Sequence, residues 1–285
     1  MSIIVTGATG SLGRFVIEGL LEKVPADRIT AVVRSEEKAA GFAARGVKIA
    51  IADYNTPETF DGVFSAGDKV LLISSSEVDK GRVGQHKVVI DAAKAAGVAL
   101  FAYTSAVGSL TAALADDHRG TEAAIVESGL PYVLLRNGWY NENYTEQLAP
   151  VLQYGAVTQA AGEGRVASAA RADYAAAAVA VLTAEGHENT TYELTGDTAW
   201  SFADYAAELS RQTGKEIAYN AVSVETFTGI LTGQAGLPGP LAAILGGVEA
   251  SIEKGELAGI SGDFFRLTGR PTTPIADSIA AALKA

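Results

Sequence analysis

The feature of the sequence that most constrains its fold is a glycine-rich segment, Thr6-Gly7-Ala8-Thr9-Gly10-Ser11-Leu12-Gly13, between an apolar run at residues 2–6 and a helical pattern at residues 11–23. In such a segment the first glycine permits a tight turn, the second lets the backbone approach a pyrophosphate, and the third allows close packing of helix and strand. The N–H groups at the start of the helix then favour a phosphate. The segment therefore predicts a dinucleotide site, with an ordinary glycine-rich turn as the alternative. No lysine follows the last glycine, which argues against a nucleoside triphosphate.

Short β-branched runs alternate with helical stretches through the first half of the chain. Strands are expected at residues 2–6, 28–34, 47–51, 69–74, 99–104 and 131–136, and helices at 11–23, 36–45, 85–96 and 120–128. Continuous apolar strands separated by helices indicate a parallel sheet that is covered on both faces. The sequence thus predicts an α/β protein with a doubly wound parallel Rossmann sheet of strand order 3-2-1-4-5-6.

The pattern changes near residue 150. Helices are expected at residues 171–183, 201–213, 222–232 and 274–284, strands at 192–195 and 216–220, and the glycine- and proline-rich segment 233–247 is interpreted as a loop that bounds short helices. We expect an NAD(P)-binding Rossmann domain at residues 1–154 and a smaller C-terminal α/β substrate lobe at 155–285, from which one or two late strands could return to the sheet. A cleft between the two parts is the expected ligand site.

The end of the second strand distinguishes the two nicotinamide dinucleotides. An acidic residue there binds the ribose 2′-hydroxyl, whereas a cation accommodates a 2′-phosphate. The strand ends at Arg34 and no acid precedes Glu36, so Arg34 predicts NADPH, with a solvated arginine as the alternative. By their positions after the third and fourth strands, Asp53 and Tyr54 are expected to contact the adenine. Ser74, Ser75 and Ser76 are expected to contact the nicotinamide ribose.

Composition excludes several classes of protein. The net charge of −11 argues against a nucleic-acid or anionic-membrane surface. The chain has no cysteine, hence no disulfide or thiolate metal site, and His86, His118 and His187 lack metal-ligand spacing, so no metal is expected. The longest apolar run, residues 174–184, is too short to span a bilayer, and the first residues do not resemble a secretory signal. We expect a cytoplasmic protein without nucleic-acid or membrane partners.

Several segments together resemble the NmrA-like group of atypical short-chain dehydrogenases: TGATGSLG, AVVR, ADY, LLISSSEV, AYTS, LLRNGWYNENY and ASAARADYAAA. Within that group the chain is most similar to bacterial NADPH-dependent quinone reductases, with triarylmethane dye reductases nearby. The resemblance covers both halves of the chain and implies NADPH and hydride delivery to quinone-like or cationic dye acceptors. The cofactor-binding residues that it implies are Gly7, Ala8, Thr9, Gly10, Ser11, Leu12, Arg34, Ser74, Ser75, Ser76, Asn137, Gly138, Trp139, Tyr140, Asn141, Glu142 and Arg171. For Arg171 the alternative is an exposed arginine paired with Asp173.

The usual acid–base pair of short-chain dehydrogenases is missing. Those enzymes place a serine, then a tyrosine, then a lysine four residues later, and the lysine lowers the pKa of the tyrosine. Here Ser105 occupies the serine position, but His118 and Glu122 stand at the other two. His118 could donate a proton, because imidazole titrates near neutrality, or it could be a surface histidine. Core packing is expected for Tyr103.

The sequence therefore assigns no catalytic residue, and His118 and Tyr140 are the candidates. Hydride addition to a quinone or to a triarylmethyl cation builds up no localised alkoxide, so a matched general acid matters less. Trp139 and Tyr140 are expected to bind a flat acceptor; an aromatic plug between the two lobes is the alternative.

The favoured function is an NADPH-dependent reductase of small quinone-type molecules. A redox-sensing NADP(H)-binding regulator without turnover and a reductase of triarylmethane dyes are the alternatives. The sequence leaves the physiological acceptor and the oligomeric state open, a homodimer included.

Overall fold

The computed structural model describes residues 1–77, 81–108 and 112–284. Its main sheet contains seven strands: β1 (Ile3–Val5), β2 (Ile29–Val33), β3 (Lys48–Ile51), β4 (Lys69–Leu72), β5 (Leu100–Ala106), β6 (Tyr132–Asn137) and β9 (Thr190–Leu194). The strands are all parallel and lie in the order β3-β2-β1-β4-β5-β6-β9. The predicted order of the first six strands is confirmed, and so is the doubly wound α/β fold.

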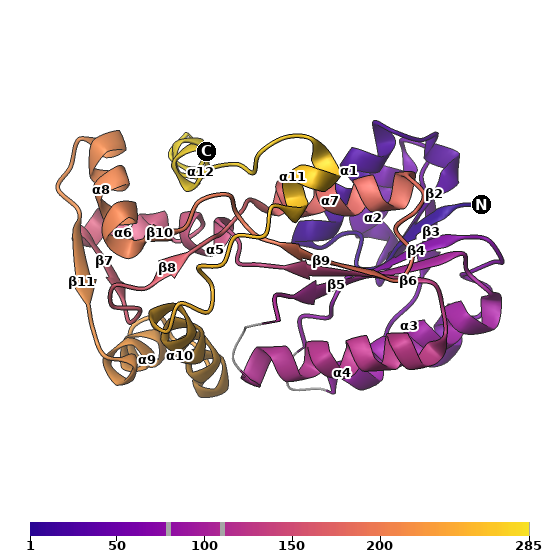
Figure 1. Cartoon of the computed structure of the whole chain (residues 1–285), viewed down its shortest axis with the longest axis horizontal. Coiled ribbons are helices and arrows are strands. Elements are labelled where there is room, and N and C mark those ends of the chain that lie inside the picture. Colours follow the sequence, from indigo (N-terminus) through magenta and orange to yellow (C-terminus); the bar gives the residue numbers. More distant parts are fainter. Residues whose placement is uncertain (78–80, 109–111, 285) are drawn as a thin grey trace.

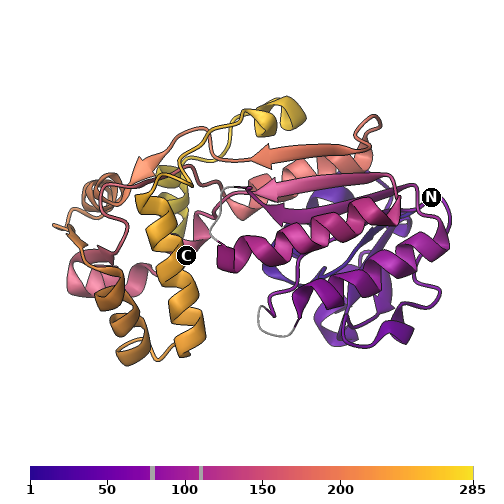
Figure 2. The same ribbon diagram turned by 60° about the horizontal axis from the view of Figure 1, so that its bottom comes forward.

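Helices cover both faces of this sheet (Figures 1 and 2). One face carries α1 (Ser11–Leu21), α2 (Glu36–Ala43), α7 (Arg171–Thr183) and α11 (Asp263–Thr268), and the other carries α3 (Arg82–Ala96) and α4 (Ala112–Ser128). Successive residues of β6 alternate between the two cores: Val133 and Leu135 pack with α1 and α7, whereas Leu134 packs with α3 and α4. Burial on both faces explains why the strands are continuous apolar runs.

The second part of the molecule lies beyond the carboxyl ends of these strands (Figure 1). Its helices are α5 (Glu142–Thr145), α6 (Leu148–Tyr154), α8 (Phe202–Thr213), α9 (Val224–Gly233), α10 (Gly239–Glu253) and α12 (Ile275–Ala282), and its strands are β7 (Ala156–Gln159), β8 (Arg165–Val166), β10 (Trp200–Ser201) and β11 (Ala218–Ala221). The parallel pair β7–β11 and the antiparallel pair β8–β10 surround a separate core rich in aromatic rings. In that core Tyr144 meets Trp200 and Phe202 edge to face, with ring centroids 5.2 Å apart in both pairs.

The late part of the chain returns to the main sheet. Helix α7 packs against α1, and β9 adds to the sheet edge, with Val133 of β6 opposite Thr190. The strand expected at residues 192–195 is this returning strand. The division into residues 1–154 and 155–285 stays a proposal, because residues 171–194 and α11 complete the layers of the first part.

The segment 233–247 was predicted as a loop, and this is wrong for most of it. Helix α10 spans Gly239–Glu253 and carries Pro240 in its first turn, where proline is well tolerated because the N–H it lacks would have no partner within the helix. A Cβ atom on Gly246 would lie 2.7 Å from Thr228 Cγ2 and 3.0 Å from Val224 Cγ1 of α9. Gly246 therefore lets two helices approach closely, a packing role that local sequence patterns do not reveal.

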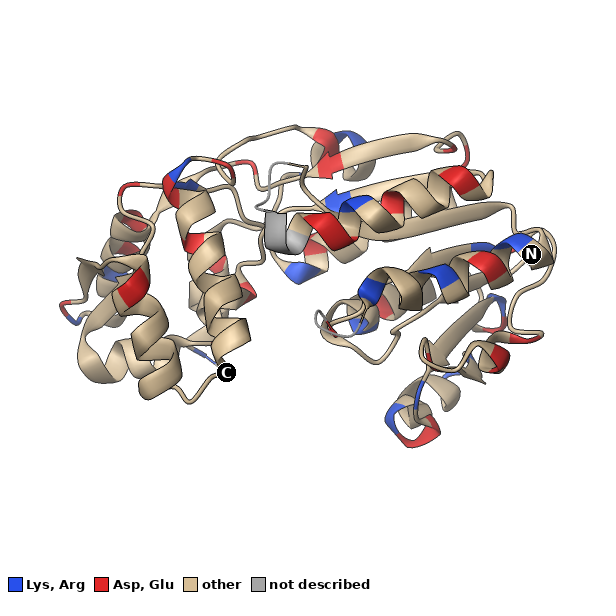
Figure 3. Cartoon of the chain, turned by 90° about the horizontal axis from the view of Figure 1, so that it is seen from below, with Lys and Arg blue, Asp and Glu red and all other residues tan. Residues whose placement is uncertain are grey.

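Charge is distributed over both parts. Figure 3 shows acidic segments in each part of the molecule, with basic and acidic positions interspersed along α3. None of the described helices combines the length and the apolar composition that a membrane span requires.

Candidate functional site

The glycine loop between β1 and α1 forms a close backbone cradle. Gly7 has a φ of +60°, in the left-handed region that favours glycine, and its carbonyl accepts a hydrogen bond from Gly10 N at 2.9 Å. A Cβ atom on Gly13 would lie 2.3 Å from Gly7 O and 2.8 Å from Ala8 Cα. Side chains are therefore excluded where helix and loop meet, which matches the packing role predicted for Gly13.

The start of α1 is suited to an anion. Its first turn contains no acidic residue, and no side chain caps it, so its N–H groups and the positive end of the helix dipole are available to a phosphate. The other loop residues shape this cradle. Ala8 is fully buried and donates its N–H to Val32 O at 3.3 Å. Thr9 O accepts a hydrogen bond from Arg14 Nε at 2.9 Å, and Ser11 and Leu12 begin the helix. The residues present fit a dinucleotide pyrophosphate.

Arg34 directly follows β2 at the carboxyl edge of the sheet. Its side chain is 68% exposed, and its Nη1 lies 3.3 Å from Glu77 Oε1. An exposed guanidinium at this position is accessible to a 2′-phosphate. Any such phosphate would share the guanidinium with Glu77.

The turn after β3 is organised by two side chains. Asp53 Oδ1 accepts from Asn55 N at 2.9 Å, which stabilises the turn itself. The Tyr54 hydroxyl lies 2.5 Å from Thr6 Oγ1 and 3.0 Å from Ile73 O. Tyr54 therefore ties the third strand's turn to the first and fourth strands, a contact that sequence reasoning did not anticipate. Burial raises its pKa, so the hydroxyl keeps its proton.

The Ser74–Ser76 turn after β4 is pinned through its backbone. Ser74 N donates to Thr104 Oγ1 at 2.9 Å, and Ser75 N donates to His86 Nε2 at 2.9 Å. The buried Ser74 side chain interacts with the Tyr103 hydroxyl: burial raises the pKa of Tyr103, and the hydrogen bond with Ser74 offsets part of this shift. The turn is therefore held by side-chain as well as backbone contacts.

The loop after β6 separates the two aromatic residues that were expected to act together. Trp139 packs with the core of the second part, whereas Tyr140 packs with the sheet core and meets Tyr174 edge to face at 5.2 Å. Neighbouring residues of an extended chain point to opposite sides, which accounts for this division. Asn137 ends β6; burial raises the pKa of Tyr140, and a hydrogen bond with the Asn137 side chain offsets part of this shift. Gly138 N donates to Leu194 O at 2.7 Å.

Three other residues of the predicted set hold this loop in place. The buried Asn141 side chain donates to Ser278 Oγ at 2.9 Å and accepts from Ser168 Oγ at 2.6 Å. Both carboxylate oxygens of Glu142 accept from Arg171 N at 3.0 Å, at the start of α7. These contacts fix the loop between the two parts of the molecule.

The Arg171 side chain is 14% exposed and pairs with Glu146, and its guanidinium lies 5.5 Å from the centroid of the Tyr140 ring. The alternative of an exposed arginine paired with Asp173 is therefore wrong. Asp173 is buried and pairs with Arg270 at 2.8 Å.

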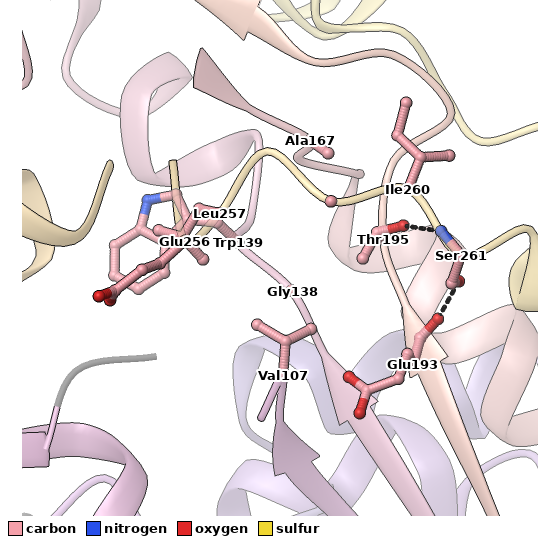
Figure 4. Close-up of a pocket in the computed structure, with 11 residues that line it drawn as sticks. Val107, Gly138, Trp139, Ala167, Glu193, Thr195, Glu256, Leu257, Ile260 and Ser261 are labelled. Carbon is pink, nitrogen blue, oxygen red and sulfur yellow. Dashed lines mark hydrogen bonds between the residues drawn. The ribbon is translucent and has the colours of Figure 1, made fainter. Parts of the chain in front are cut away.

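A cavity of about 210 Å³ opens at the carboxyl ends of β5, β6 and β9 (Figure 4). Trp139 and Gly138 line one side, and the segment 256–261 covers another (Figure 4). The wall is mainly apolar, with Val107, Leu257 and Ile260, and it also carries the carboxylates of Glu193 and Glu256. Its mainly apolar wall suits a small, largely apolar molecule. Tyr140 does not line this cavity.

The positions of the missing acid–base pair are engaged in internal contacts. Ser105 Oγ donates to Glu122 Oε1 at 2.5 Å, and Glu122 accepts from Arg136 at 2.7 and 2.9 Å. Arg136 Nη1 also lies 2.8 Å from Glu193 Oε1. Glu122 and the neighbouring carboxylate raise the pKa of Arg136, so the guanidinium stays charged. Ser105 and Glu122 thus belong to a network in which Arg136 pairs with two carboxylates and the serine hydroxyl donates to one of them.

His118 is half-buried, so the interpretation as a surface histidine is wrong. Its Nδ1 lies 2.8 Å from the hydroxyl of Tyr103, a fully buried residue of β5. Burial, followed by the charge of Arg82, lowers the pKa of His118 to about 4. The imidazole is thus neutral at physiological pH and is a poor general acid. Among the described residues, no group of three or more His, Asp or Glu side chains could hold a metal ion.

Comparisons with known proteins agree with this geometry. A family model described as NAD(P)H-binding matches residues 7–185. Quinone oxidoreductase 2 of Escherichia coli K12 is 46% identical over 279 residues, which cover 97% of each chain. Its crystal structure in complex with NADPH superposes with a TM-score of 0.94 at 44% identity over 99% of both chains. Triphenylmethane reductase of Citrobacter sp. gives a TM-score of 0.95 at 40% identity over the full length of both.

These matches confirm the resemblance drawn from the motifs. They extend over both parts of the molecule, including the segment around Trp139 and the helices of the C-terminal part. The family model alone covers more than half of the chain and begins within the glycine loop. The chain belongs to the NAD(P)H-binding family.

Proposed function

We propose that this protein is an NADPH-dependent reductase that delivers hydride to quinone-type acceptors. The observation that carries the proposal is the glycine cradle at the start of α1, found in a chain that matches a quinone oxidoreductase over 97% of its length. When bound, NADPH supplies the hydride. In this proposal the predicted cofactor-binding residues, from Gly7 to Arg171, hold the dinucleotide along the carboxyl edge of the sheet.

The chain's own residues bind and orient the reactants. The N–H groups of the glycine loop bind the pyrophosphate, and Arg34 binds the 2′-phosphate. Trp139 provides an aromatic wall against which a flat acceptor packs, and the segment 256–261 keeps water from that side of the cavity. Holding two reactants in the right geometry is the main catalytic contribution here.

No described side chain takes the place of the usual tyrosine. His118 is neutral and Glu122 is paired with Arg136. A quinone acceptor tolerates this arrangement, because the charge that develops on it is spread over the ring and the second oxygen. The proton that completes the hydroquinone comes from solvent in this proposal.

A reductase of triarylmethane dyes is the second candidate function. It is favoured by the structural match to triphenylmethane reductase and by the carboxylate of Glu256 in the cavity wall, whereas the carboxylate of Glu193 is already paired with Arg136. A carboxylate at the wall favours a cationic acceptor over an anionic one. Both functions use the same hydride transfer and differ in the acceptor.

The test is NADPH oxidation, followed by the absorbance of the reduced nicotinamide, with benzoquinone, naphthoquinone, a triarylmethane dye and a simple ketone. We expect rapid reduction of the quinones and poor reduction of the ketone, with NADPH preferred over NADH. Binding of NADPH without reduction of any acceptor would support the regulatory alternative. Preferred reduction of the ketone would contradict the proposal.

The cellular setting belongs to the same proposal. The lack of cysteine is compatible with a reducing compartment, and we propose the cytoplasm. We propose that the partner is a small-molecule acceptor and that the protein does not bind nucleic acid. We also propose a homodimer, which sedimentation would test.

A further inference from the structure

A histidine that the proposed function does not use lies beneath the Ser74–Ser76 turn. His86 of α3 is fully buried, and both of its ring nitrogens are hydrogen-bonded. Nε2 lies 2.9 Å from Ser75 N, and Nδ1 lies 2.8 Å from Thr121 Oγ1. Thr121 Oγ1 lies 2.9 Å from Asp117 O, which accepts its proton.

This arrangement selects one tautomer of the imidazole. A backbone N–H can only donate, so Nε2 must accept from Ser75 and carries no proton. Nδ1 then carries the proton and donates to Thr121, whose own proton goes to Asp117 O. Burial, with smaller contributions from Arg82 and His118, lowers the pKa of His86 to about 3, in agreement with a neutral ring.

The ring has little freedom to move. Tyr103 meets it at a centroid distance of 5.3 Å, and Tyr54 at 6.2 Å, both edge to face or nearly so. Tyr54 also contacts Ile73 O, directly before the turn. His86 thus connects α3 and α4 to the turn that ends β4.

The turn is fixed mainly through its backbone. Ser74 N is held by Thr104 and Ser75 N by His86, and the buried Ser74 side chain interacts with Tyr103. Two consecutive N–H groups of the turn are thus engaged by the protein before any ligand binds. A preorganised turn binds with a smaller loss of conformational entropy than a mobile one.

We propose that His86 is a positioning residue for cofactor binding, whose imidazole holds Ser75 N so that the Ser74–Ser76 turn is preorganised to contact the dinucleotide. This inference rests on the proposed function, because it assumes that the turn faces the bound NADPH. His86 itself contacts the turn and not the cofactor.

Two amide substitutions separate the two hydrogen bonds of the ring. In His86→Gln the amide reaches the place of Nε2 and can still accept from Ser75 N. In His86→Asn the amide reaches only the place of Nδ1, so the bond to Thr121 is kept and the bond to Ser75 is lost. We expect the dissociation constant of NADPH, measured by calorimetric titration, to rise about fivefold or more in His86→Asn and to change less than about twofold in His86→Gln.

His187 provides the matched control. It lies in the turn before β9, at the opposite end of the sheet, and its Nδ1 is 2.8 Å from the Tyr192 hydroxyl. His187→Asn and His187→Gln should leave NADPH affinity unchanged. If His86→Asn binds NADPH as tightly as the wild type, or if both His86 variants lose affinity and thermal stability equally, the positioning role is wrong.

Nitrogen NMR of the wild-type protein gives a test that needs no variant. We expect His86 Nδ1 to be protonated and Nε2 to be unprotonated, and the Ser75 amide signal to shift when NADPH is added. A protonated Nε2, or a Ser75 signal unchanged at saturating NADPH, would overturn the inference. Failure of the wild type to bind NADPH at all would instead refute the proposed function, while the imidazole signals would still report the hydrogen bond to Ser75.

Discussion

Replacing Glu249 with glutamine should remove a pH dependence of stability that comes from one buried carboxyl group. Glu249 lies on α10, is 4% exposed, and accepts a hydrogen bond from Ala160 N at 2.8 Å. Burial raises its pKa from the ordinary 4.5 to about 7, and the backbone hydrogen bonds offset only part of this shift. Between those two pH values the folded protein holds a proton that the unfolded chain releases.

The sign and size of the effect follow from linkage. Because the folded state binds more protons in this window, stability decreases as the pH rises from about 4.5 to about 7. A shift of roughly 2.5 pKa units, at 1.36 kcal/mol per unit, corresponds to about 3 kcal/mol of lost stability above pH 7. Glutamine does not titrate, so Glu249→Gln should lack this loss.

The assay is urea denaturation of the wild type and of Glu249→Gln at about pH 5 and about pH 8.5. The amide can cost some stability at both values, because its NH2 group would meet a backbone N–H, so the change with pH is the quantity to compare. Relative to the wild type, the variant should gain about 2–3 kcal/mol on going from the lower to the higher pH. Glu253→Gln, an exposed position on the same helix, should show no such gain. A stability difference between Glu249→Gln and the wild type that is equal at both pH values would refute the reasoning.

Further predictions concern cofactor and acceptor. Arg34→Ala should reduce the preference for NADPH over NADH by about tenfold, the lower end for a charge-assisted contact, because the guanidinium is exposed and already meets Glu77; equal wild-type affinities for both cofactors would contradict this. Gly10→Val should abolish NADPH binding in calorimetric titration while circular dichroism stays close to that of the wild type, because its branched side chain would occupy the phosphate position. His118→Ala should lower kcat less than tenfold, well short of the roughly 10²–10⁴-fold loss of a general acid, because the imidazole is already neutral; a thousandfold loss with unchanged NADPH affinity would refute hydride transfer without a protein acid. Trp139→Ala should lower kcat/KM for quinones more than His118→Ala does, since it removes the wall of the cavity, and equal effects would place the acceptor elsewhere.

The dinucleotide-binding half of the protein could be predicted from local patterns. An apolar strand, a glycine loop and a helix start follow one another along the chain, so the chemistry of the cradle is carried by neighbouring residues. The order of the first six strands follows from the doubly wound fold that this alternation of strands and helices indicates. The same pattern located Arg34 at the end of β2, where the structure also has it.

Long-range contacts decided the rest, because no local pattern encodes them. His86 meets Ser75 and Thr121 across separations of 11 and 35 residues, so nothing in its own segment marks it as a support for the turn. Trp139 and Tyr140 are adjacent in sequence, but they pack into different cores.

The same limit explains the helix that was mistaken for a loop and the acid–base positions that turned out to be structural. Gly246 breaks helices by propensity, yet here it permits contact with α9, a decision made by the neighbouring helix. Glu122 stands at the lysine position of a dehydrogenase, but Arg136, on a neighbouring strand, commits it to an ion pair. The sequence alone determined the parallel fold and the phosphate cradle, whose interactions are local; tertiary structure determined which polar side chains support the site, because their partners come from distant segments.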